Sequence, residues 1–467
     1  MINTIRNSSY HKWLVLLTVG IQIITGGIDN GSLSLALPKL SIIFGVGPDI
    51  ILWLVAAFMV VAVGLALTWG SLGDTFGRKQ VYLWGFIVFS AGLGILAVSQ
   101  TVPQLIFGRV IQAIGQSMTV TNGFAIAVAV FPLNQRGLVI GLVGGLVGVG
   151  LSIGPLFGAF ILENFHWRLL FWTRIPLSLI AMGLVAIIIP PDPKLMHTKR
   201  TFDYFGAISL FIGLTSLLLI INRFPIEGVS SLRIIILIIV CILSTTFFFI
   251  NERKVENPVL DLSLFKSKFL SISLLIHFMH FLAYMLLFFL IPFFLISGKG
   301  LETSQVGLLV ASIQIVRLFV SPMAGMLGDY FGSARMSTIG LILTTLGIGM
   351  MSQLGPDSNV LLILGSLMTT GLGASIFDPS NEHSVLSAIP NEKLASGTAL
   401  TATARQIGFS ISTTIAGTLY ASRLRFYEVD LEYNLAVTKS FQEVLYIGLA
   451  IMALATIFSL MRGKDKR

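Results

Sequence analysis

The chain has 467 residues, of which 55% are apolar and only 11% charged, with one cysteine and a formal net charge of +9. Soluble proteins carry about 25% charged residues, so this chain has too little polar surface for a soluble domain, and its main solvent must be lipid. Lysine and arginine lie singly at the ends of apolar stretches instead of clustering, which argues against nucleic-acid binding. The single Cys241 excludes an internal disulfide framework and multi-cysteine metal sites.

Apolar stretches long enough to cross a bilayer recur along the whole chain. A hydrocarbon core about 30 Å thick needs about 20 apolar residues in a helix, and breaks at charged, proline and glycine clusters give fourteen candidate spans. They cover residues 12–36, 50–70, 80–99, 103–129, 138–162, 169–189, 203–222, 232–250, 269–296, 303–323, 335–353, 359–379, 395–420 and 441–461. The first is too long for a cleaved signal peptide, so we expect it to remain as a span.

The positions of basic residues predict the orientation. With the N-terminus inside, 18 lysines and arginines fall on the inner side and 8 on the outer side. This excess predicts a multi-pass protein of the cell membrane with both termini in the cytoplasm. The remaining four, Arg109, Arg174, Arg317 and Arg405, lie within spans.

An internal repeat indicates two related halves. GSLGDTFG begins at Gly70 and GMLGDYFG at Gly325, with six of eight positions identical at an offset of 255 residues. Eight predicted spans separate the copies, so two six-helix halves leave two extra helices between them. We therefore predict an N-terminal six-helix bundle in residues 1–190, two additional helices in 191–256 and a C-terminal six-helix bundle in 257–467.

Several motifs resemble those of the major facilitator superfamily, and specifically its fourteen-span drug:proton antiporter branch. They are GSLGDTFGRK at 70–79, IDNGSLSLALP at 28–38, LIFGRVIQAIGQS at 105–117, GLVGVGLSIGPLFGAF at 145–160, HWRLLFWTRIP at 166–176, TFDYFG at 201–206 and NPVLDLSLF at 257–265. Ala113 stands where the fourth-span motif usually has glycine, and Arg174 where the branch often has asparagine.

The resemblance implies an all-α integral membrane protein with the major facilitator fold. It further implies a secondary active exporter that works by alternating access, exchanging protons for amphipathic or hydrophobic small molecules as multidrug efflux proteins do. We expect no cofactor besides the proton gradient, a small-molecule substrate, a lipid bilayer as surroundings, no nucleic acid, and function as a monomer.

Asp29 is the leading candidate for proton coupling because a carboxylate inside an apolar span is costly unless it is paired, hydrated or protonated. A residue near the outer interface, bonded to its neighbours, is the alternative. Arg109 is its expected partner, with Gln112 and Gln116 on the same helical face; a snorkelling arginine is the alternative there. Gln112 and Gln116 are also candidates for lining the substrate cavity. Asn30 beside Asp29 is a candidate for contact with substrate.

The repeated loop is predicted to act as a conformational latch. Its residues are Gly70, Asp74, Gly77 and Arg78 in the first copy, with Asp329 in the second. Asp74 can cap a helix or pair with a base on another element, and glycine permits close approach. A solvated basic turn is the alternative.

Glycines dominate the fifth span, where Gly150, Gly154, Pro155 and Gly158 are candidates for a hinge. Small residues three and four positions apart let helices approach closely, which explains most of the pattern without a hinge. The hinge and a seal against leakage are what the family resemblance adds.

Polar residues in other spans are candidates for the wall of an aqueous path: Arg174, Gln314, Arg405 and Gln406. For Arg317, an anchoring role beside the second loop is an equal alternative. We expect Asp378 and Glu382 to cap an inner helix end, which leaves the middle of the second half without an acid.

His277 and His280 are spaced as one helical turn, but too few further ligands accompany them for a metal site, and we predict none. The aromatic residues around them are candidates for a wall against a planar ligand, although lipid contact is commoner.

Four functions remain open. A neutral or anionic amphiphile or a specific metabolite is the main alternative substrate, because Asp29 is the only acid counted in the spans. An enzyme would need a nucleophile with a base or a metal cluster, and a sensor a sizeable soluble domain. The sequence supplies neither, and we predict that the protein is not an enzyme. No phosphate-binding loop for ATP occurs.

Overall fold

The computed structural model describes residues 10–46, 48–51, 53–190, 202–228, 231–255 and 258–463. This part of the chain is almost entirely helical and contains no strand. Its α-helices are α2 (His11–Phe44), α3 (Pro48–Ile51), α4 (Trp53–Gly64), α5 (Ala66–Phe76), α6 (Arg78–Val98), α7 (Val102–Val130), α8 (Arg136–Asn164), α9 (Leu169–Trp172), α10 (Arg174–Ile188), α11 (Tyr204–Glu227), α12 (Leu232–Glu252), α13 (Lys268–Phe293), α14 (Thr303–Phe331), α15 (Ser333–Met351), α16 (Val360–Ser387), α17 (Leu394–Tyr427) and α18 (Tyr433–Met461).

Within the described residues, twelve helices are long and apolar enough to cross a membrane, or thirteen if the bent pair α4 and α5 forms one span. The prediction of an all-helical membrane protein is therefore confirmed, but the predicted number of fourteen spans is not reached. The remaining candidate is α17, whose 34 residues would extend about 51 Å at 1.5 Å per residue. Its sequence is more polar than that of the other long helices, with Thr401, Ser410 and Ser412 buried inside the protein.

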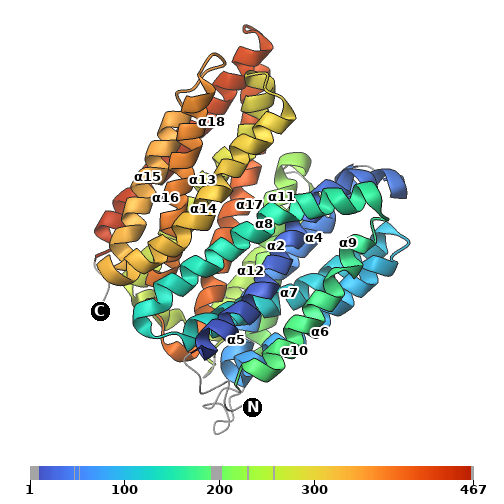
Figure 1. Ribbon diagram of the computed structural model, residues 1–467, viewed down its shortest axis with the longest axis vertical. Helices are drawn as coiled ribbons and strands as arrows, with labels where there is room; N and C mark the ends of the chain where they lie inside the picture. The colour runs from blue at the N-terminus through green and yellow to red at the C-terminus, as the bar shows by residue number, and fades with distance from the viewer. Residues whose placement is uncertain are drawn as a thin grey trace.

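The helices form two groups, α2 to α10 and α13 to α18. Figure 1 shows the groups close together in the lower part of the view and diverging toward the top, with both chain ends in the lower half. At the lower end α2 begins and α18 ends. There His11 lies 3.0 Å from the carbonyl of Ile188, and Arg462 donates to the carbonyl of Ala334 at 2.9 Å. We call this the terminal end.

Apolar packing follows the same division. One buried cluster lies wholly within α13 to α18 and its neighbouring loops, and another lies within the first group of helices. A third cluster belongs mainly to α2, α6, α7, α8 and α10 but includes Leu386, Leu394 and Ala395 of the second group. The two halves therefore share an apolar core at the terminal end.

The second predicted span is broken by a bend of 41° between α4 and α5. The bend falls at Gly64 and Leu65, and a Cβ on Gly64 would lie 2.9 Å from Phe211 of α11. Glycine weakens helix continuity and leaves room for the neighbouring ring. The bend thus lets α11 lie directly against the first half.

The helices α11 and α12 fall in the segment predicted to hold two additional spans. α11 packs against α4 of the first half and α17 of the second, where Thr414 donates to the carbonyl of Ile221 at 3.0 Å. α12 packs on α11, and only 11% of its most apolar 18-residue stretch is buried inside the protein. The exposed apolar surface of α12 suits contact with lipid chains.

The close approach of Gly325 to Gly137 makes a stability prediction. A Cβ on Gly325 would overlap the carbonyl oxygen of Gly137 on the opposite half, so Gly325→Ala should lower the melting temperature in detergent. Overpacking costs about 1–3 kcal/mol. The control is Gly365→Ala in α16, where an added Cβ meets nothing within 4 Å; it should leave the melting temperature unchanged or raise it. Equal melting temperatures for the two variants would contradict the close contact.

Candidate functional site

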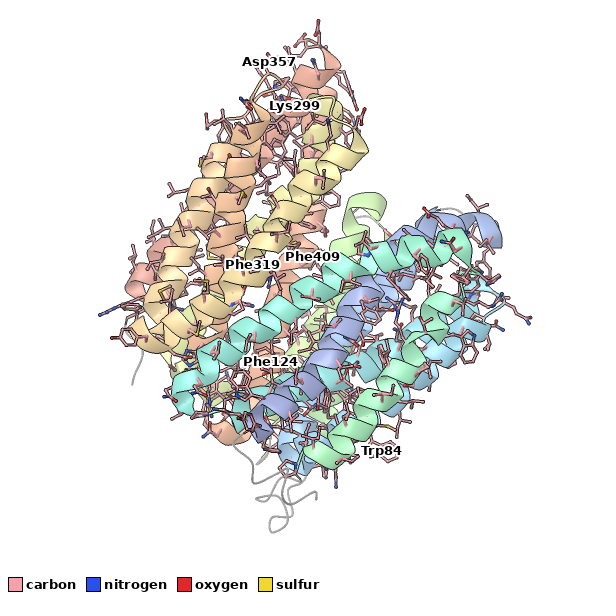
Figure 2. All side chains as sticks on the ribbon, viewed as in Figure 1. Trp84, Phe124, Lys299, Phe319, Asp357 and Phe409 are labelled. Carbon is pink, nitrogen blue, oxygen red and sulfur yellow. The ribbon has the colours of Figure 1, made fainter. Side chains whose placement is uncertain are left out.

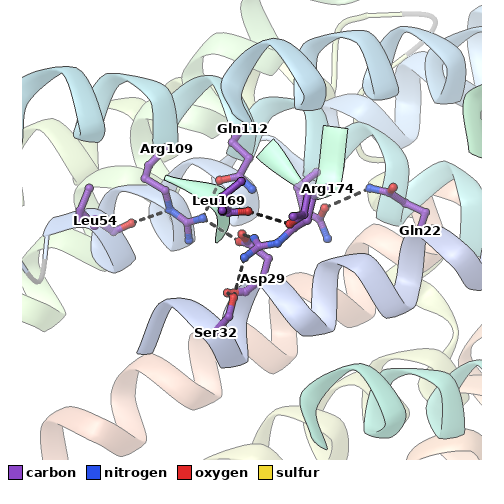
Figure 3. A network of polar contacts seen from close by, with 10 residues as sticks. Gln22, Asp29, Ser32, Leu54, Arg109, Gln112, Leu169 and Arg174 are labelled. Carbon is purple, nitrogen blue, oxygen red and sulfur yellow. Dashed lines mark hydrogen bonds and ion pairs between the residues drawn. The ribbon is translucent and has the colours of Figure 1, made fainter. Parts of the chain in front are cut away.

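The first polar cluster centres on Asp29, in the middle of α2. Arg109 of α7 donates from Nη1 to Asp29 Oδ2 at 2.7 Å, and Arg174 at the start of α10 pairs with Oδ1. All three side chains are at most 2% exposed. Figure 3 shows the two guanidinium groups converging on the carboxylate from different helices. Three elements are therefore joined by one buried acid.

Other donors and acceptors complete this cluster. Arg109 also donates from Nε to the carbonyl of Leu54 at 3.0 Å and from Nη1 to Gln112 at 2.6 Å, while Arg174 donates to Ser32 at 2.6 Å. The guanidinium of Arg109 lies 4.1 Å from the ring centre of Phe58, a favourable cation–π distance. With one carboxylate and two guanidiniums, the cluster carries one excess positive charge.

These positions bear on the alternatives for Asp29 and Arg109. Neither residue points toward lipid or an interface, since each is 1% exposed and each is bonded to the other. Gln116 lies further along α7 and accepts from Gln22 at 3.4 Å, and Gln22 also donates to Thr119 at 3.3 Å. The side chain of Asn30 lies outside the described residues.

A cavity of about 290 Å³ lies between the two halves. Its apolar wall comes from the first half and includes Ile23, Phe124, Ile140, Val143, Val147 and Leu151. Its polar wall comes mainly from the second half, as Arg317, Asp378, Glu382 and Arg405, with Gln116 from the first. The two walls differ in polarity, which suits a ligand with one apolar and one polar side.

The expectation that the second half lacks a central acid is wrong. Asp378 does not cap an inner helix end, but pairs with Arg317 at 2.8 Å beside the cavity. Glu382 also lines the cavity and accepts from Thr401 at 3.0 Å. Both acids lie within α16 and on one face of it, because they are four residues apart. This spacing is visible in the sequence and was the signal for a shared site. Arg317 therefore lines the cavity and does not serve as an anchor beside the second repeated loop.

The remaining sequence candidates are divided between the cavity and its surroundings. Arg405 lines the cavity and lies 5.7 Å from the ring centre of Phe281. Gln406 donates to the sulfur of Met59 at 3.3 Å, linking α17 to α4. Gln314 Oε1 is buried without a hydrogen-bond donor among the described residues. Arg174 does not line the cavity, because it is bonded to Asp29.

The repeated loops join the halves reciprocally at the terminal end. Asp74 accepts hydrogen bonds from the backbone N–H groups of Ala395 and Ser396 at 3.3 and 2.9 Å, in the first turn of α17. Asp329 accepts from Gly137 and Leu138 at 2.8 and 3.0 Å, in the first turn of α8. Each aspartate thus caps a helix of the opposite half, where the positive end of the helix dipole favours its charge.

Basic residues and glycines support this contact. Arg78 donates to Asp74 at 2.9 Å and to the carbonyl of Asn391 at 2.6 Å. A Cβ on Gly70 would lie 2.8 Å from the carbonyl oxygen of Ala395, so a larger residue would separate the halves. Gly77 and Gly332 end the two loops with φ of 107° and 99°, a conformation that glycine adopts freely.

A second ion pair lies beside the capped end of α17. Lys393 donates to Asp261 at 2.6 Å, tying the segment before α13 to the start of α17. Partial burial raises the pKa of Asp261, but the hydrogen bonds from Lys393 and Ser263 outweigh that effect and hold the pKa below its usual value. Asp261 therefore stays charged and paired at neutral pH.

The glycines of α8 fit closely against α2. A Cβ on Gly150 would lie 2.7 Å from the carbonyl oxygen of Ile24, one on Gly154 would lie 2.9 Å from Gly31, and one on Gly158 would lie 2.8 Å from Ser32. Pro155 contacts Gly31 at the same seam. Close packing accounts for all four positions, and the hinge stays a prediction.

The two histidines of α13 are both buried. Among the described residues, no group of three histidine, cysteine, aspartate or glutamate side chains is arranged to hold a metal ion. His277 lies 3.3 Å from Asn381 and beside the cavity. His280 packs against Tyr284 and Phe377, with ring centres 5.6 and 4.1 Å away.

Comparisons with known proteins identify the family of this chain. The family model of the Major Facilitator Superfamily matches residues 19–413 and again 273–467, so the chain belongs to that superfamily. It is a multi-pass membrane protein of the transporter class. The chain is 31% identical to the riboflavin transporter RibZ of Clostridioides difficile (strain 630), over 97% of this chain and 99% of the relative.

Other relatives and a solved structure extend the similarity. The chain is 26% identical to the multidrug export protein EmrB of Escherichia coli (strain K12), over 90% of this chain and 82% of that one. The proton:xylose symporter XylE, bound to 6-bromo-6-deoxy-D-glucose, shares the fold with a TM-score of 0.66 at 14% identity, covering 96% of each chain. These relatives are transporters and not enzymes.

The charge balance at Asp29 predicts how two variants differ in stability. Asp29→Asn leaves two buried guanidiniums without a carboxylate and should destabilise the protein by about 3–5 kcal/mol. Arg174→Gln leaves Asp29 paired with Arg109 and should cost clearly less. Thermal unfolding in detergent checks the order of the two. A greater loss of stability for Arg174→Gln would show that Asp29 is not the centre of the cluster.

Proposed function

We propose that the protein is a secondary active transporter that moves an amphipathic or hydrophobic small molecule across the cell membrane by alternating access. The observation that carries the proposal is the cavity of about 290 Å³ between the halves, with walls from both. Because the halves are joined at the terminal end by two capped helices, the substrate path in this conformation opens toward the other end. The excess of basic residues on the side of the termini places both termini in the cytoplasm in this proposal.

Exchange for protons is the coupling that we propose. In the described state the single negative charge of Asp29 lies between two arginines. Adding a proton to Asp29 would raise the excess positive charge of this cluster from one to two, which favours separation of the guanidiniums. Separating Arg109 and Arg174 would move α7 and α10 relative to α2. Protonation and the movement of the first half are thereby linked, with Asp29 and Arg109 as the coupling pair.

Export of structurally varied compounds is the first candidate for the direction of transport. The similarity to the multidrug export protein EmrB supports it. The apolar wall of the cavity imposes few specific hydrogen bonds, as broad specificity requires. The polar wall holds two acids and two arginines, so its net charge selects against neither cations nor anions.

Transport of one specific metabolite is the second candidate. The similarity to the riboflavin transporter RibZ over nearly the full length of both chains favours it. A planar ring system with a polar chain would match the apolar wall on one side and the charged residues on the other. Riboflavin is therefore the first metabolite to test.

Transport by purified protein in liposomes distinguishes these candidates. Under an imposed pH gradient, we would add riboflavin, the cation tetraphenylphosphonium and the anion taurocholate, and follow both solute movement and internal pH. We expect the addition of one or more of these solutes to cause proton flux, recorded as a change of internal pH. Asp29→Asn should reduce this flux by more than about tenfold, because the amide cannot take up and release a proton between the two buried arginines. Asp29→Glu keeps the carboxylate and should retain more of the flux.

The control is Asp430→Asn, at an exposed position outside the long helices. It should transport like the unaltered protein. Solute movement that ignores the pH gradient would exclude proton coupling, and unchanged proton flux in folded Asp29→Asn would exclude Asp29. Movement of riboflavin alone would favour the metabolite transporter, and movement of several unrelated compounds the multidrug exporter.

A further inference from the structure

A second carboxylate in the membrane is less fully paired than Asp29. Asp378 of α16 contacts Arg317 of α14 through Oδ2 at 2.8 Å, and both side chains line the cavity. The other carboxylate oxygen, Oδ1, is buried without a hydrogen-bond donor among the described residues. An ionised oxygen without a donor is costly in a low-dielectric interior. Asp378 therefore has an acceptor that remains to be satisfied.

The neighbour of this oxygen is His280 of α13. Its Nε2 lies 3.6 Å from Asp378 Oδ1, slightly beyond a normal hydrogen bond. The ring is fully buried and is held by Tyr284 and Phe377, and neither ring nitrogen has a hydrogen-bond partner in the described part of the chain. Two buried atoms without partners thus face each other across a gap that one proton would bridge.

The charges around this pair come from four helices. α13 contributes His277 and Tyr284, α14 contributes Arg317, α16 contributes Glu382, and α17 contributes Arg405. Arg462, directly after the end of α18, is the nearby base from a fifth element, and it donates hydrogen bonds to Ser273 and Asn381. Around the cavity, two acids balance two arginines when the histidines are neutral. One added proton would leave an excess positive charge beside the space for substrate.

We propose that Asp378 and His280 together bind a transported proton in the second half, at the wall of the substrate cavity. This inference rests on the proposed function and adds a site to it. A hydronium ion in the cavity gives its proton to the pair and leaves as water. The proton lies between Asp378 Oδ1 and His280 Nε2, and the charge of the Asp378, His280 and Arg317 group rises from zero to plus one.

Two differences from Asp29 favour this assignment. Both oxygens of Asp29 are held by guanidinium groups, whereas one oxygen of Asp378 is unoccupied. Asp378 lines the cavity, whereas Asp29 does not. A proton can therefore reach Asp378 from the same space that holds substrate. Occupation by proton and by a positively charged or bulky solute at this wall is then mutually unfavourable, which is what exchange requires.

The test compares Asp378→Asn and His280→Gln with matched controls at exposed positions. Asp357→Asn removes an acid at the end of the second half remote from the chain termini, where Figure 2 labels it. His166→Gln removes an exposed histidine between α8 and α9. His280→Gln keeps the Asp378–Arg317 ion pair, so it remains informative if Asp378→Asn does not fold. Gel filtration establishes folding in each case.

The first measurement needs no substrate. An infrared difference spectrum of the purified protein between acidic and neutral pH records protonation of carboxylate and imidazole groups. We expect one set of bands to disappear in both Asp378→Asn and His280→Gln, or the pH at which it changes to shift by about one unit or more. Both controls should keep the set unchanged. Bands that stay unchanged in folded His280→Gln would overturn the shared site, whether or not the protein transports any tested compound.

The second measurement separates coupling from substrate binding. In liposomes, riboflavin uptake driven by a pH gradient should fall more than about tenfold in the two variants, and by a clearly larger factor than riboflavin exchange without a gradient falls in the same variant. Uptake at the unaltered rate in either variant would contradict the proposal. If riboflavin does not move in the unaltered protein, tetraphenylphosphonium takes its place, and failure of every solute would count against the proposed function while the infrared result still decides the proton site.

Discussion

The cost of an uncompensated charge in a low-dielectric interior constrains the whole structure. Each ionised group buried in a span needs a partner, and that partner must come from another helix if it is to join the bundle. Asp29 of α2 meets this requirement with Arg109 of α7 and Arg174 of α10. Asp378 of α16 meets it with Arg317 of α14. The ion pairs thus decide which helices must remain neighbours. They also make those neighbours sensitive to a change of charge.

The two halves use this constraint differently. In the first half the acid is held by two guanidiniums and does not line the cavity, so its charge acts on helix positions. In the second half the acids and arginines stand at the cavity wall itself, so their charges act directly on whatever enters. An apolar wall on one side and a charged wall on the other follow from this division.

Sequence reasoning could predict the helical class, the repeated loops and the importance of Asp29 and Arg109, because each depends on local patterns: apolar length, a repeated string, and a charge inside an apolar run. It could not predict partners that depend on helix rotation. The sequence predicts Arg174 at the substrate path, whereas the structure pairs it with Asp29. The sequence predicts Asp378 and Glu382 at a helix end, because the apolar run stops near them although α16 continues to Ser387. The spacing of the two acids was the available signal.

The same limit explains the number of spans. The prediction counts residues 50–70 and 395–420 as simple apolar spans, but α4 bends away from α5 at a glycine, and α17 has polar residues buried against other helices. Such helices owe their place to neighbouring protein. The histidine pair of α13 is a further example, because only the rotation of α13 against α16 brings His280 to Asp378.

The reciprocal caps at the terminal end have a consequence for the equilibrium between conformations. A helix cap is worth about 0.5–2 kcal/mol, and opening the terminal end would release both Asp74 and Asp329 from the opposite half together. At about 1 kcal/mol each, the pair biases the empty protein toward the described state by roughly thirtyfold. Substrate or proton binding must supply a comparable difference in affinity between the two states to make the cycle turn. The two aspartates thereby set a threshold that any transported solute has to exceed.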